Sequence, residues 1–193
     1  QDVVLKWVLI KNNEMPGVFL NNMTIEFIDN LLSFNIENDN IGFHVLEEKL
    51  IFEILISKLL STNNNTRNKA KISMVNFGKL VSYQHYFMLI VERARIINDI
   101  DVQRILIDFL KVYCFEKGNT CTLTEENLFQ LIELLNISVA NCEEFKLKVI
   151  ELIKILSDKV PNELMLGISR TANGIQTLLK FHGVKLPEQL DQE

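Results

Sequence analysis

Apolar residues recur with helical spacing along this chain, in paired segments that repeat about every 40 residues. The pattern is clearest over 44–60, where Lys49, Glu53 and Ser57 form a polar stripe between apolar positions spaced by one, three and four. The segment 61–65 interrupts it, and a second apolar-periodic segment follows over 66–80. The pairs begin near positions 1, 44, 82, 123 and 159, in steps of 43, 38, 41 and 36 residues. We therefore expect pairs of helices joined by short loops.

Turn-forming residues are scarce, which favours helices over a β-sandwich, because a sandwich needs frequent Gly and Pro at its turns. The chain holds 7 Gly and 3 Pro in 193 residues. Thr122 with Glu125 and Asn141 with Glu144 have the spacing of capping boxes, which start helices. The expected helix pairs span 3–10 with 16–34, 44–60 with 66–80, 83–95 with 101–114, 123–136 with 142–156, and 161–172 with 175–182.

A helix-pair repeat near 40 residues is typical of HEAT and armadillo arrays, in which neighbouring pairs stack to bury their apolar faces. The prediction is an all-α fold, an α-solenoid of about five HEAT-like helix pairs. One domain would cover 1–186, with 187–193 as a C-terminal tail or linker. The alternative is an irregular helical bundle whose spacing arose by chance.

Charge and motifs exclude several function classes. The formal net charge is −5, whereas nucleic-acid binding needs a basic surface. No apolar run reaches the roughly 20 residues of a membrane span, and the three cysteines form no C-x-x-C pair. The three histidines are far apart, and no phosphate-binding or nucleophile motif is present. We expect a cytoplasmic protein that is not an enzyme and has no metal, no cofactor, no nucleic-acid partner and no membrane contact.

Basic residues are concentrated in one repeat. No acidic residue lies between Glu53 and Glu92, a stretch that carries five lysines and arginines, whereas residues 1–53 carry nine acids against three lysines. This stretch is either a contact for an acidic partner or an ordinary solvated helix face. Trp7 is the single tryptophan. Its apolar neighbours favour burial in the core, and the alternative is an anchor offered to a partner.

The chain resembles a TOG domain, the HEAT-repeat tubulin-binding module of the ch-TOG and Mini spindles microtubule polymerases, and most of all a fourth-position TOG domain. The resemblance rests on Leu5-Lys-Trp7 in the first helix, on Leu55-Ile-Ser-Lys58-Leu-Leu followed by Arg67-Asn-Lys-Ala-Lys71, on the pair spacing, and on 156–170 near the end. The family implies a flat paddle whose intra-repeat loops bind the side of an αβ-tubulin dimer. It also implies a location in the cytoplasm and on the cytoskeleton, at a spindle or centrosome, and a place beside flanking domains of one protein.

The resemblance also implies site residues along the loop edge. Trp7 matches the first-loop tryptophan of the family, and Lys11 lies in the expected first loop, 11–15. The remaining implied tubulin contacts are basic residues near the second, third and fourth loops: Lys58, Arg67, Lys69, Arg95, Arg104 and Lys146.

Three functions remain as hypotheses from the sequence. The first is a tubulin-binding module that acts through its loop edge. The second is a HEAT or armadillo scaffold that holds another protein on the face of its second helices. The third is an architectural repeat that packs on neighbouring domains, which predicts a large apolar patch at one terminal helix because polar capping would be missing there.

Overall fold

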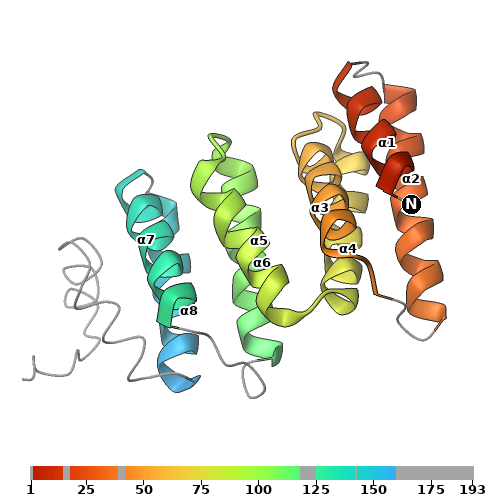
Figure 1. Ribbon diagram of the computed structural model, residues 1–193. Coiled ribbons are helices and arrows are strands. Elements are labelled where there is room, and N and C mark those ends of the chain that lie inside the picture. Colours follow the sequence, from red (N-terminus) through yellow and green to blue (C-terminus); the bar gives the residue numbers. More distant parts are fainter. Residues whose placement is uncertain (1, 15–17, 39–41, 118–124, 142, 160–193) are drawn as a thin grey trace, which may run out of the picture. The chain divides into compact units, whose positions relative to one another are not determined.

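The computed structural model describes residues 2–14, 18–38, 42–117, 125–141 and 143–159. Within these ranges the chain forms eight α-helices and no strand (Figure 1). The expected fifth pair, over 161–182, and the tail 187–193 lie outside the described residues. The helices are α1 (Asp2–Glu14), α2 (Val18–Glu37), α3 (Val45–Leu59), α4 (Asn64–Leu80), α5 (Tyr83–Ile96), α6 (Ile100–Lys117), α7 (Glu125–Asn141) and α8 (Glu143–Lys159).

The chain divides into two compact units, Gln1–Leu89 and Ile90–Glu193, and the boundary falls inside α5. Unit 1 holds α1 to α4 with the first half of α5. Unit 2 holds the second half of α5 with α6, α7 and α8.

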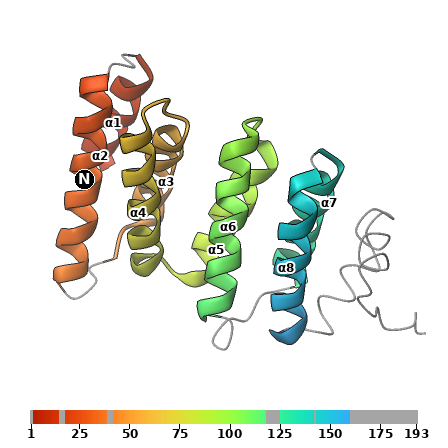
Figure 2. The ribbon, with the colours of Figure 1, turned by 180° about the vertical axis from the view of Figure 1, so that it is seen from behind.

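In unit 1 the helices pack first on first and second on second. Helix α1 lies against α3, and α2 lies against α4, as Figure 1 and the view from behind in Figure 2 both show. This order is that of a helical repeat, in which each pair covers an apolar face of the next. The fully buried apolar side chains of these four helices include Ile25, Ile28, Leu32, Ile51, Phe52, Leu55, Ala70, Met74 and Phe77.

Polar side chains mark the register between α2 and α4. The Thr66 hydroxyl donates to Asn22 Oδ1 at 2.9 Å, and the Ser73 hydroxyl donates to Asp29 Oδ1 at 2.9 Å. In each of the two bonds, the donor and the acceptor residue lie 44 positions apart in the sequence. Because both hydroxyl-bearing residues are buried, these bonds satisfy groups that water does not reach.

The start of α5 is fastened to α3 and α4 within unit 1. The buried Tyr86 hydroxyl donates to the Met74 carbonyl at 2.9 Å, and its ring meets Phe77 edge-on with centroids 5.8 Å apart. His85 Nδ1 contacts the carboxylate of Glu48, which is also buried. The Tyr86 contacts join the consecutive helices α4 and α5, and the His85–Glu48 contact joins helices about one repeat apart in the sequence.

Unit 2 repeats the same kind of packing between second helices. Helices α6 and α8 lie together, and α7 packs on α8. Lys111 pairs with Glu151, and Lys148 pairs with Asp108, each across 40 residues. The Lys111 hydrogen bond lowers the pKa of the Glu151 carboxyl. Buried apolar side chains of α6, α7 and α8, such as Leu106, Leu131, Phe145 and Leu152, form the core.

The all-helical prediction and the order of the pairs are confirmed for the described residues. Helices α3, α5 and α7 begin at 45, 83 and 125, close to the expected starts. His44 and Glu47 form a capping box before α3, and Asn63 caps α4. The expected first loop, 11–15, is wrong in most of its length, because α1 continues to Glu14. The polar run Lys11-Asn-Asn-Glu14 contains no Gly or Pro that would stop a helix.

Candidate functional site

Trp7 lies on the surface of α1, and its predicted burial in the core is wrong. The side chain is 58% exposed, and it shares one face with Val3 and Ile10 at intervals of four and three. Leu5, which points to another side of the helix, is the buried residue of this segment. An exposed tryptophan with apolar neighbours is typical of the anchor residues of protein–protein interfaces.

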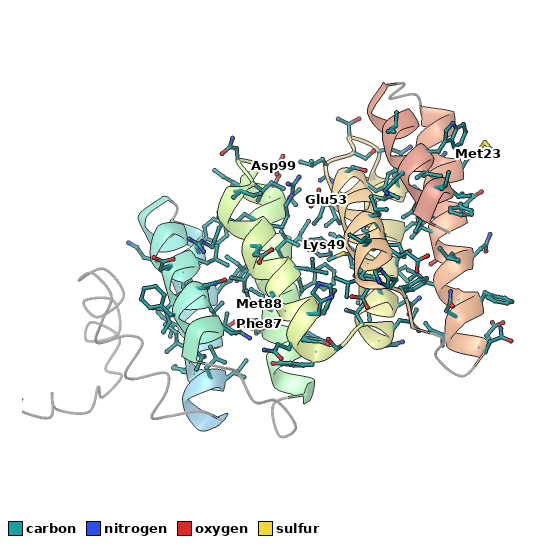
Figure 3. The ribbon with its side chains drawn as sticks, in the orientation of Figure 1. Met23, Lys49, Glu53, Phe87, Met88 and Asp99 are labelled. Carbon is teal, nitrogen blue, oxygen red and sulfur yellow. The ribbon has the colours of Figure 1, made fainter. Side chains whose placement is uncertain are left out.

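A second apolar stripe runs along α2. Met23, Phe27 and Phe34 recur at intervals of four and seven and are 52%, 39% and 60% exposed. Figure 3 shows Met23 on the outer side of α2, turned away from α3 and α4. The side of α2 that meets α4 carries polar residues, among them Asn22 and Asp29. The exposed stripe is therefore a separate face of the helix.

The equivalent positions on α4, the second helix of the next pair, show whether this face is covered there. Helices α2 and α4 end at residues 37 and 80, so equivalent positions are 43 residues apart. The α4 equivalents of Met23, Phe27 and Phe34 are residues 66, 70 and 77, all of them fully buried. Thr66 at the first of these positions bonds to α2. Phe77 at the last position packs on Phe52 of α3 and Tyr86 of α5. Neighbouring helices thus cover this face of α4, while the same face of α2 is left open by the described residues.

Lys58 is fully buried near the end of α3, so its side chain contributes no exposed charge. Burial lowers the pKa of Lys58 from its ordinary 10.5 to about 8, because the ammonium loses hydration. Sequence reasoning missed this burial, although a signal was present. Lys58 lies four residues after Ile54 and three after Leu55, on the apolar side of the helix.

Arg67 and Lys69 are engaged inside unit 1. Arg67 donates to the Ser61 carbonyl from Nε at 3.2 Å and from Nη2 at 2.9 Å. The guanidinium thereby binds a carbonyl of the α3–α4 loop. Lys69 Nζ lies 3.1 Å from Glu26 Oε1 on α2. Both arginine and lysine hold neighbouring elements together, and both remain partly accessible.

Two of the predicted contacts in unit 2 are paired with acids. Arg95 Nη2 lies 3.0 Å from Glu133 Oε2, joining α5 to α7. Arg104 pairs with Asp101 one turn earlier on α6. Lys146 is half-buried on α8. Lys11 lies in α1 rather than in a loop, and its side chain is outside the described residues.

The basic stretch between Glu53 and Glu92 does not gather on one surface patch. Lys58 is buried, Arg67 binds a loop carbonyl and Lys69 pairs with an acid of the first repeat. The two others lie on α4, where Lys71 is half-buried and Lys79 is exposed and bonds to Asn76. The solvated-face interpretation of this stretch therefore fits the geometry better than a dense cationic patch.

On α4, the second-helix face that a scaffold would use carries a smaller apolar feature than the stripe of α2. Ile72 and Val75 on α4 are 61% and 49% exposed. They are flanked on the same face by Asn68 and Lys79. Two aliphatic residues in a polar surround are a common surface feature and do not mark a binding site by themselves.

Nothing in the described part of the chain assembles a metal centre or a membrane span. No three His, Cys, Asp or Glu side chains in the described ranges converge as metal ligands would. None of the eight described helices combines the length and apolar character needed to cross a bilayer. In comparisons with known proteins, no family model, no curated protein and no solved structure matches the chain.

Proposed function

We propose that this chain is a non-enzymatic helical-repeat module that works by binding another protein. The single observation that supports it is the exposed Trp7 on α1, because a large aromatic side chain held in water is costly unless a partner covers it. The proposed architecture is an α-solenoid of HEAT-like pairs within one domain. The register of 43 to 44 residues between α2 and α4 and of 40 between α6 and α8 supports that repeat.

The proposed partner is αβ-tubulin, the partner that the TOG resemblance implies. Trp7 would be the hydrophobic anchor. The partly exposed Lys69 and Arg104 would add charge contacts at the margin, since rim charges steer encounter more than they add affinity. Both side chains already have acidic neighbours in the chain, so we expect their contribution to be small. A cytoplasmic, cytoskeletal location is part of this proposal.

The test is sedimentation velocity of the chain with soluble αβ-tubulin at low and at physiological salt. Wild type should co-sediment with tubulin, and Trp7→Ala should weaken binding by roughly tenfold or more. Ile72→Ala, an exposed apolar truncation on α4, is the matched control and should bind as wild type does. No binding at either salt, or equal binding by all three proteins, would contradict the proposal.

The second candidate function is an architectural repeat that packs on neighbouring domains of the same protein. The observation that favours it is the apolar stripe on α2, whose counterpart one repeat later is buried. A terminal pair that ended an array would normally present a polar outer face. A surface of this kind fits a role in packing even if tubulin is not the partner.

A further inference from the structure

We infer that the apolar face of the first helix pair is covered by the same face of a second copy of this chain. We take the exposed apolar stripes of α1 and α2, two helices that pack on each other, together as this face and call it the hairpin face. The stripes are Val3, Trp7 and Ile10, and Met23, Phe27 and Phe34.

The size of the hairpin face suits a symmetric dimer. An aromatic side chain can bury ~150–250 Å², so the exposed fractions of these six side chains add up to roughly 600 Å². The largest apolar patch on a typical monomer is about 300–600 Å², and a standard interface takes about 800 Å² from each partner. The hairpin face with a polar rim therefore reaches the area that a stable dimer needs.

The kind of occupant follows from the repeat. On α4, the face equivalent to the α2 stripe is covered by other helices: Thr66 bonds to Asn22 of α2, and Phe77 packs on Phe52 of α3 and Tyr86 of α5. The occupant that this geometry suits is another helix pair. A second copy supplies one, and a two-fold axis lets both copies cover the same apolar face at once.

The charges at the margin permit self-pairing. Lys6 follows Val3 by three residues on α1, and Glu37 follows Phe34 by three on α2, so both lie beside their stripes. Both are exposed. Because one margin of the face carries a lysine and the other a glutamate, two copies can pair without bringing like charges together.

Trp7 belongs to the hairpin face, so self-association and tubulin binding through Trp7 would exclude one another. This one consequence rests on the proposed function. The dimer itself is tested on the chain alone, so its failure and a failure to bind tubulin are separate results.

The experiment is sedimentation velocity of the full chain over a wide concentration range, with Trp7 emission recorded on the same samples. Wild type should pass from monomer to dimer, and its emission should shift to the blue in parallel as the indole leaves water. The double variant Phe27→Asp with Phe34→Asp should weaken dimerisation by roughly tenfold or more. Both side chains are exposed, so circular dichroism should show the helices unchanged.

The matched control is Ile72→Asp with Val75→Asp, which places the same charges on exposed apolar positions of α4. This variant should dimerise as wild type does. A wild type that stays monomeric with unchanged emission at every concentration overturns the inference and leaves a helix pair of another polypeptide as the occupant. Equal weakening of dimerisation by the two double variants overturns the inference too. The wild-type concentration series tests the dimer without relying on any variant.

Discussion

Lys69 on α4 pairs with Glu26 on α2, 43 residues earlier in the sequence, with Nζ and Oε1 3.1 Å apart. The same number separates the starts of the first two helix pairs expected from the sequence. The hydroxyl bonds of Thr66 and Ser73 fall one residue from this offset. Stacked repeats bring equivalent positions into contact, so residues one repeat apart in the sequence lie side by side in the structure.

The buried hydroxyl of Ser73 makes Asp29 a structural residue. Asp29→Ala should lower the free energy of unfolding by about 1–3 kcal/mol, because it leaves a buried polar group without its carboxylate partner. Glu26→Ala is the matched control on the same helix, and removing this exposed pair should cost about 0–1 kcal/mol. Urea unfolding followed by circular dichroism measures both. Equal losses would show that the burial of the Ser73–Asp29 bond does not set its contribution to stability.

Gly78 gives the Tyr86 ring the room it needs. A Cβ at residue 78 would lie 2.8 Å from Tyr86 Cε1, and the ring is held by its hydrogen bond to Met74. Gly78→Ala should therefore lower stability by about 1–2 kcal/mol, although alanine is the better helix former by up to about 1 kcal/mol. Gly42→Ala is the control, since no atom lies within 4 Å of its added Cβ. A stabilised Gly78→Ala variant would contradict the packing described for α4 and α5.

Burial of Lys58 makes stability depend on pH. Below pH 8 the ammonium is charged in both states, so the cost of burying it is present in full. Between pH 8 and pH 10.5 the folded chain releases the proton first, so the unfolded chain binds more protons and stability rises with pH. Lys58→Met should remove this rise and stabilise the chain at pH 7 by up to about 3 kcal/mol.

The pH test compares urea unfolding of wild type and Lys58→Met from pH 7 to pH 10.5, so that titrations common to both cancel. Lys79→Met, a change at an exposed lysine of α4, should leave the pH profile as in wild type. Parallel profiles for wild type and Lys58→Met would mean that Lys58 keeps an ordinary pKa.

Glu48 and His85 fasten α3 to the start of α5. His85→Leu should destabilise unit 1 by about 1–3 kcal/mol, because the buried carboxyl group of Glu48 then loses its hydrogen-bond partner. Adding Glu48→Leu should recover a large part of that loss, since it removes the buried polar group that was left without a partner. A double-mutant cycle by urea unfolding gives the coupling. Additive losses would argue against a direct contact.

The helix pairs were predictable because amphipathic spacing and capping residues are local signals. His44 with Glu47 and Asn63 show this at the starts of α3 and α4. The exposed side of α1 was not predictable from its sequence. Apolar residues occupy positions 3–5 and 7–10, which surround the helix, so only packing against α2 and α3 decides that Leu5 is buried and Trp7 is not.

The basic candidate residues show the limit of reading charge along a sequence. Lys58 is buried, whereas Lys69 and Arg95 find acids on helices about one repeat away. Charge partners at such distances depend on which helices stack, which a local pattern does not reveal. The repeat offset itself was the usable signal, because Glu26 precedes Lys69 by one period and Glu133 follows Arg95 by nearly one.

The measurement that tests the account most directly is acrylamide quenching of Trp7 in dilute native chain, compared with the chain unfolded in urea. Trp7 is the only tryptophan, so the signal reports one side chain. With 58% of the side chain exposed, we predict emission near that of the unfolded chain and quenching of similar strength. Blue-shifted emission with little quenching by acrylamide at every dilution would place Trp7 in the core and contradict the hairpin face.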